Sequence, residues 1–106
     1  MHLAEQRVNK QLSKCQESCT EYMLKEWNEN QPNVRFLEIT IDEPYALVTW
    51  RLEDTKGDAI LSQDEGYWKL RNISVGIFGI EDFENTDIPL DVAQRMLKLH
   101  HQKLGY

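Results

Sequence analysis

The sequence predicts a single α+β domain, built from an N-terminal amphipathic helix, a four-stranded antiparallel meander sheet and a C-terminal helix. Three observations lead to this fold class. The chain has 106 residues, which is no more than one ordinary domain. Its apolar residues recur at helical spacing near both ends and at every second position in the middle. Short turn sequences separate the apolar runs of the middle part, as expected for neighbouring antiparallel strands. We therefore expect residues 1–106 to fold as one unit.

The first element is predicted to be a helix from Leu3 to about Trp27. This stretch contains neither Gly nor Pro, and an apolar stripe recurs every three or four residues along it. The members of the stripe are Val8, Leu12, Cys15, Cys19 and Tyr22. The helix is expected to end in the stretch 28–33, because Pro32 cannot continue it.

Cys15 and Cys19 are the only cysteines, and they lie four residues apart on this stripe. Side chains at that spacing on a helix point the same way, which disfavours a disulfide between them. We interpret them as two buried core residues; the alternative is an intermolecular disulfide or a metal site across a dimer interface. Reduced thiols suit a cytoplasmic location, and no secretory signal is recognisable at the start of the chain. The alternative location is outside the cell, if a signal peptide has been removed.

The middle of the chain is predicted to form the four strands. Alternating apolar residues predict strands at Val34–Ile41, Tyr45–Leu52, Asp58–Gln63 and Tyr67–Val75. The connections between them are short and rich in turn-forming residues, and the stretch 53–57 is expected to be a hairpin loop. This arrangement predicts a meander with one face packed against the first helix.

The last element is predicted to be a helix that begins at Thr86 or Asp87, since either residue can cap it and Pro89 suits its first turn. Before it, the stretch 76–80 breaks the strand alternation and bends the chain away from the sheet. Gly105 is expected to end the helix. Its inner face is expected to consist of Val92, Ala93, Met96, Leu97, His100 and Leu104.

A sequence resemblance covers about residues 42–100. It rests on Tyr45–Trp50, Gly57–Leu61, Gly66–Leu70, Gly76, and Ile88-Pro89 with Ala93. In this order the segments resemble a group of small bacterial α+β domains, in which a strand ending in Trp leads through a hairpin to a Gly-x-Ala-Leu-Leu strand, a glycine-rich bend and a closing helix. The resemblance implies an architecture like the cystatin-like and nuclear-transport-factor-two-like folds, and it implies no assigned activity. Many members of the group look exported, and this chain departs from them by having Ser74–Gly79 in place of a run of glycines.

Charge and hydropathy exclude two classes of partner. The sequence has twelve Lys and Arg residues and eighteen Asp and Glu residues, which gives a formal net charge of −6. This charge is unsuited to binding the phosphate backbone of a nucleic acid. No apolar run approaches the ~18–20 residues that a membrane-spanning helix needs. We therefore expect neither nucleic acid nor membrane as a partner.

No motif points to an enzyme, which leaves catalysis uncertain and not favoured. The sequence has no strand followed by a Gly-x-Ser-x-Gly turn, and no Cys on a loop near a His. A carboxylate of the meander together with His100 could form an acid–base dyad in a pocket, but no one carboxylate stands out.

The imidazole and sulfur groups lack the close ligand pairs of a zinc site, so no metal and no cofactor are predicted. They include His2, His100, His101, Cys15, Cys19 and Met96. His100 and His101 are instead expected to be a solvent-facing pair whose charge suits the C-terminal end of the last helix.

An acidic segment precedes the last helix. From Glu81 to Asp91 the chain has five carboxylates and no Lys or Arg. These charges suit the start of the helix, and they would also suit docking of a basic partner.

The favoured function is non-catalytic binding of a protein partner, or of a second copy of the chain as a homodimer. The candidate binding residues are Glu81, Asp82, Glu84, Asp87, Tyr67 and Phe78. The alternatives are a small-molecule pocket or enzyme between the first helix and the sheet, and an acidic inhibitor or immunity-type protein.

Overall fold

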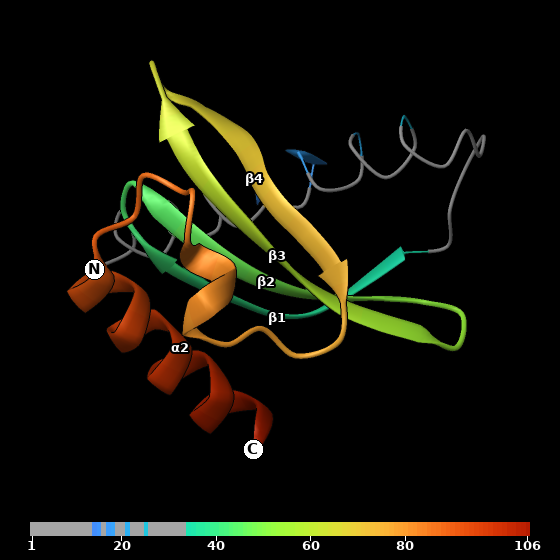
Figure 1. Ribbon diagram of the computed structural model, residues 1–106. Helices are drawn as coiled ribbons and strands as arrows, with labels where there is room; N and C mark the ends of the chain where they lie inside the picture. The colour runs from blue at the N-terminus through green and yellow to red at the C-terminus, as the bar shows by residue number, and fades with distance from the viewer. Residues whose placement is uncertain (1–13, 16, 19–20, 22–24, 26–33) are drawn as a thin grey trace, which may run out of the picture.

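A four-stranded antiparallel sheet with one C-terminal helix forms the described part of the molecule (Figure 1). The computed structural model describes residues 14, 15, 17, 18, 21, 25 and 34–106. The strands are β1 (Val34–Asp42), β2 (Tyr45–Leu52), β3 (Thr55–Asp64) and β4 (Tyr67–Val75), and they lie in the order β1-β2-β3-β4. The predicted meander is therefore confirmed.

The third strand begins earlier than the sequence analysis predicted. Leu52 pairs with Thr55, so that the turn between β2 and β3 consists of Glu53 and Asp54 alone. Glu53 adopts a positive φ of 55°, the conformation that closes so tight a turn. The stretch 55–57, predicted to be loop, is thereby part of the sheet.

The predicted N-terminal helix lies mostly outside the described residues, and so does Cys19. Cys15 is described and fully buried, which confirms its expected place in the core. Ser18 Oγ also reaches the sheet, where it donates a hydrogen bond of 3.4 Å to the backbone carbonyl oxygen of Trp68.

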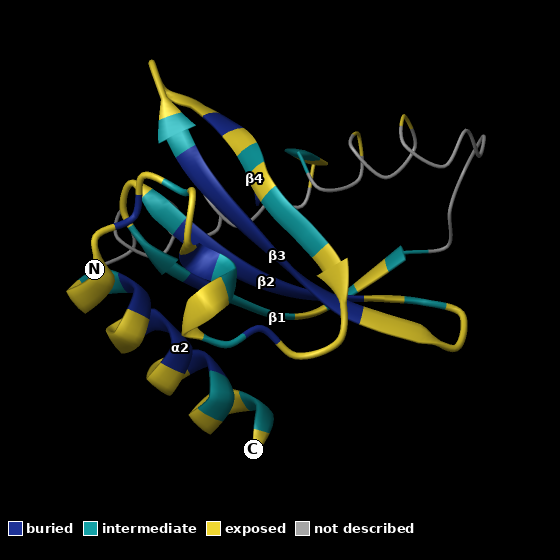
Figure 2. Ribbon diagram, in the orientation of Figure 1, coloured by how far each residue is buried: buried dark blue, intermediate teal, exposed yellow. Residues whose placement is uncertain are grey.

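The two central strands are buried on both faces (Figure 2). On one face, Ala46, Val48 and Trp50 of β2 pack in a cluster with Cys15. On the other face, Leu47 and Ile60 pack against the helix and against the segment that leads to it. Because β2 and β3 carry apolar residues at successive positions, their burial extends beyond the one face that alternation alone predicted.

The helix α2 (Leu90–Leu104) begins later than predicted, with Pro89 at its N-cap in place of Thr86 or Asp87. Thr86 instead belongs to a turn, in which its hydroxyl donates to the carbonyl oxygen of Phe83 at 2.6 Å and accepts from the amide of Ile88 at 3.4 Å. That turn follows the short 3₁₀ helix η1 (Ile80–Phe83). The predicted end of the helix is confirmed, because Gly105 has the left-handed conformation with φ 80°.

Two ion pairs fix α2 along β1. Arg95 on the first half of the helix lies 2.7 Å from Asp42 at the end of β1. Lys103, two turns further on, lies 3.5 Å from Glu38. This alignment places the last turns of α2 over β1 and β2. No helix in the described part of the chain combines the length and the apolar character that a membrane-spanning segment needs.

Candidate functional site

A row of buried polar side chains lies between α2 and the sheet. Thr40, Thr49 and Asp58 come from three neighbouring strands, and each is at most 3% exposed. Thr49 and Asp58 are directly paired across β2 and β3, so both point to the side of the sheet that α2 covers. His100 completes the row from the helix, four residues after the buried Met96 on the same helix face, and it is 0% exposed.

These side chains form one hydrogen-bond chain whose direction can be derived. The Thr49 hydroxyl donates its single hydrogen to Asp58 Oδ1 at 2.6 Å. It can therefore only accept from His100 Nε2, which lies 2.7 Å away. The His100 ring thus carries its hydrogen on Nε2, and its Nδ1 accepts from the hydroxyl of Thr40 at 2.8 Å.

The two residues at the ends of this hydrogen-bond chain, Thr40 and Asp58, have further partners. At one end, the Lys103 ammonium donates to the Thr40 hydroxyl at 3.3 Å. At the other end, the backbone amide of Phe78 donates to Asp58 Oδ2 at 2.9 Å. The hydrogen-bond chain therefore runs from the exposed ammonium of Lys103 on α2, through the neutral imidazole of His100, to the buried carboxylate of Asp58 on β3.

Burial is the main reason that His100 stays neutral. Loss of solvent lowers the pKa of His100 from 6.5 to about 4, and the negative charges of Asp58 and Glu38 oppose that shift only in part. The expectation that His100 and His101 form a solvent-facing pair is thus wrong for His100. Its helical spacing from Met96 put it on the inner face, and the threonines of β1 and β2 give its ring nitrogens partners there.

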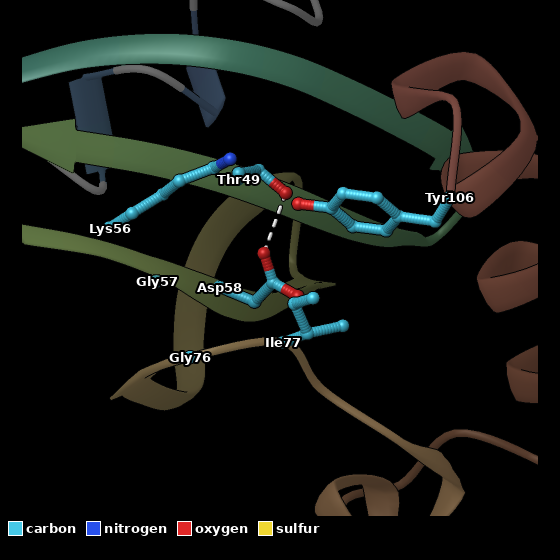
Figure 3. Close-up of a pocket in the computed structure, with 7 residues that line it drawn as sticks. All are labelled: Thr49, Lys56, Gly57, Asp58, Gly76, Ile77 and Tyr106. Atoms are coloured by element: carbon cyan, nitrogen blue, oxygen red, sulfur yellow. Dashed lines mark hydrogen bonds between the residues drawn. The ribbon is translucent and has the colours of Figure 1, made fainter.

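A pocket of about 200 Å³ opens beside the carboxylate end of this chain (Figure 3). It is lined by Thr49, Lys56, Gly57, Asp58, Gly76, Ile77 and Tyr106. Thr49 and Asp58 are the most buried side chains of this lining, whereas Ile77 and Tyr106 are 63% and 52% exposed. In the view of Figure 3, Lys56 and Tyr106 approach the Thr49–Asp58 pair from opposite sides.

Two glycines let the backbone close one side of the pocket. The amide of Gly76 donates to the carbonyl oxygen of Lys56 at 3.0 Å, which brings the end of β4 against the start of β3. A Cβ on Gly57 would lie 2.1 Å from the carbonyl oxygen of Ser74 and 2.5 Å from the ring of Trp50. Only glycine fits at this position without a shift of the backbone.

None of the residues that the sequence analysis offered for partner binding lines this pocket, although the backbone amide of Phe78 contacts the Asp58 carboxylate that does. Glu81, Glu84 and Asp87 are exposed, and Asp87 is 3.7 Å from Arg71 on β4. Asp82 accepts a hydrogen bond of 2.8 Å from the amide of Gly79, so it stabilises the start of η1.

The two aromatic residues offered for binding are also separated. Tyr67 is 75% exposed and lies in the first position of β4, next to the β3–β4 turn. Along the strand it is about 13 Å from Arg71, which contacts the acidic segment. Phe78 is only 2% exposed and packs in the core beneath α2.

The sequence allows a dyad of His100 with a carboxylate, but nothing in the sequence singles out Asp58. The available signal was a Thr inside an otherwise apolar strand run and an Asp at the predicted start of the next strand, which matters only once the register pairs Thr49 with Asp58. This pocket lies on the α2 side of the sheet. The alternative hypothesis of a pocket between the first helix and the sheet stays a prediction, because most of that helix lies outside the described residues.

Within the described residues, no group of three or more His, Cys, Asp or Glu side chains is arranged to hold a metal ion. Comparison of the chain with known protein families, with curated proteins and with solved structures found no match. Its function therefore has to be inferred from the geometry of its own residues.

Proposed function

We propose that the protein is a binding protein for a small polar molecule, which enters the pocket and presents a positively charged or hydrogen-bond-donating group to Asp58. The observation that carries this proposal is the buried hydrogen-bond chain that fixes the Asp58 carboxylate at the pocket. A carboxylate offers about four acceptor positions. Thr49 and the amide of Phe78 take two of them, which leaves acceptor capacity for a ligand.

The charge of Asp58 supports a donor or cation as the ligand group. No ion pair joins Asp58 to any residue in the described part of the chain. A buried carboxylate without a cation is costly, because hydrogen bonds replace only part of its lost hydration. A ligand with an ammonium group would provide the missing opposite charge.

The same geometry favours binding over acid–base catalysis. His100 does not line the pocket and reaches Asp58 only through Thr49. It therefore acts here as a positioning residue, which holds the Thr49 hydroxyl with its hydrogen directed at Asp58.

Protein binding through the acidic segment stays a prediction and has less support in the geometry. Asp82 and Asp87 already have partners within the chain, and Phe78 lies in the core. The acidic-inhibitor alternative depends on the same exposed carboxylates and stays a prediction for the same reason.

A titration with propylamine, followed by amide NMR, tests the proposed function. We expect saturable shifts at Gly57, Gly76 and Ile77, and their loss in Asp58→Asn. The matched control is Asp91→Asn, which removes an exposed carboxylate from the first turn of α2. Equal responses in Asp58→Asn and the wild-type protein, or no saturable shifts at the pocket, would contradict the proposal.

A further inference from the structure

A row of three cationic side chains crosses the sheet next to the pocket. Arg35 pairs with Arg51, and Arg51 pairs with Lys56, so the three residues occupy neighbouring positions on β1, β2 and β3. Their side chains point to the α2 side, because the next pair along, Phe36 with Trp50, packs in the core of the opposite face. All three residues are exposed.

This row is unusual for its charge as well as for its position. The chain carries a net charge of −6, yet like charges stand directly opposite each other on three adjacent strands, which is a destabilising arrangement. None of the three forms an ion pair with a residue in the described part of the chain. An anionic group placed between neighbouring members would relieve this repulsion.

The row adjoins the carboxylate of the pocket. Arg51 with Lys56 and Thr49 with Asp58 are successive same-face pairs of β2 and β3. Positions two apart on a strand are separated by about 6.7 Å, so Lys56 stands one such step from Asp58. The pocket is therefore bordered by an anion at its buried end and by a cation at its open end.

Tyr106 holds Lys56 at this open end. The Lys56 ammonium lies 5.8 Å from the centre of the Tyr106 ring, a cation–π contact that draws the side chain over the pocket. Gly105, in its left-handed conformation, turns the chain at the end of α2 so that Tyr106 lies within reach.

We infer that the ligand is a small zwitterion, whose ammonium group binds Asp58 and whose oxyanion, a carboxylate or a phosphate, binds Lys56 and Arg51. This inference rests on the proposed function and adds the second charged group. A linker of about two carbons between the two charges suits the single-step spacing of Lys56 and Asp58 along β3. Arg51 supplies the planar guanidinium that binds carboxylate and phosphate oxygens in pairs.

The test compares four probes by NMR titration: β-alanine, O-phosphoethanolamine, propylamine and propionate. We expect at least one of the two zwitterions to bind about tenfold more tightly than propylamine and than propionate, because a hydrogen bond to a charged group contributes that much. Whichever zwitterion binds more tightly identifies the oxyanion as carboxylate or phosphate.

Two variants test whether Lys56 and Arg51 bind the oxyanion of the zwitterion. Lys56→Gln and Arg51→Gln should each remove most of the zwitterion's advantage over propylamine, and neither should weaken the binding of propylamine, which has no oxyanion. The matched control is Lys98→Gln, which removes an exposed cation from the outer side of α2 and should have no effect.

The outcomes separate this inference from the proposed function. Propylamine binding as tightly as both zwitterions would overturn the oxyanion site and leave the proposed function standing. Propionate binding as tightly as the zwitterions, with no effect of Asp58→Asn, would overturn the ammonium site. No saturable response to any of the four probes would overturn both.

Discussion

His100 donates from Nε2 to the Oγ1 atom of Thr49, across 2.7 Å in the interface between α2 and the sheet. The direction of this bond follows from the Thr49 hydroxyl, whose only hydrogen is already directed at Asp58. A proton added to Nδ1 of His100 would oppose the Thr40 hydroxyl, which donates to that nitrogen. The hydrogen-bond chain is thus compatible with neutral His100 and must rearrange when the ring becomes charged.

The first prediction concerns the titration of His100. Because burial lowers the pKa of His100 to about 4, its ring resonances should stay unchanged from pH 8 to about pH 5 and move only below that. Measurement of the Cε1–H chemical shifts of both ring systems at the end of α2 checks this, with His101 as the internal comparison. A His100 resonance with its midpoint near pH 6.5 would contradict the buried arrangement.

The same shift makes the stability of the fold depend on pH. The pKa of His100 is lower in the folded state than in the unfolded state, so the unfolded chain binds the proton first as the pH falls. The stabilisation of the folded state by neutral, buried His100 is fully present above pH 6.5, declines between pH 6.5 and about pH 4, and is lost below pH 4. Its size is about 3 kcal/mol. Urea unfolding of the wild-type protein and of His101→Gln should show the same decline, which a His100→Gln variant should lack.

The second prediction isolates the Thr49 hydroxyl. Thr49→Val keeps the shape of the side chain but leaves His100 Nε2 and Asp58 Oδ1 without this partner, which should lower the free energy of unfolding by about 2–4 kcal/mol. Thr49→Ser keeps the hydroxyl and should cost about 1 kcal/mol for the lost methyl group. Equal losses in the two variants, measured by urea unfolding, would show that the hydroxyl has no special role.

The arrangement of secondary structure was more predictable than the site. Alternation and short turns predicted the meander, since each strand pairs with the next, and Gly105 was recognisable as the end of α2. The predicted start of α2 was wrong, because Thr86 can either cap a helix or close a turn. Only the packing of Phe83 and Ile88 in the core selects the turn. Local sequence does not carry that information.

The pocket depended on strand register and on contacts distant in sequence. Thr49 and Asp58 become a pair through the two-residue turn between β2 and β3, and His100 is 51 residues from Thr49. A histidine near the end of a helix suits solvent as well as a buried position, and its helix face alone did not decide between them. The row of Arg35, Arg51 and Lys56 likewise depends on the register of three strands, and no sequence motif marks any of the three residues.

The third prediction concerns the glycine at the side of the pocket. Gly57→Ala should lower the free energy of unfolding by about 3 kcal/mol or more, because its Cβ would collide with the carbonyl oxygen of Ser74 and with the Trp50 ring. Gly66→Ala is the comparison: its φ of 84° is strained for alanine, but the space around it is open, so about 1 kcal/mol is expected. Chemical denaturation of both variants checks the order. A smaller loss for Gly57→Ala than for Gly66→Ala would contradict the close approach of β3 and β4.

The last prediction separates a structural from an exposed carboxylate within the acidic segment. Asp82 accepts from the amide of Gly79 at the start of η1, so Asp82→Ala should lower the free energy of unfolding by about 1 kcal/mol. Glu84 is exposed and follows η1, so Glu84→Ala should leave the stability within about 0.5 kcal/mol of the wild-type value. Urea unfolding at pH 7 measures both. Equal effects of the two substitutions would mean that the Asp82 contact does not stabilise η1, and Asp82 would then be as available to a basic partner as Glu84.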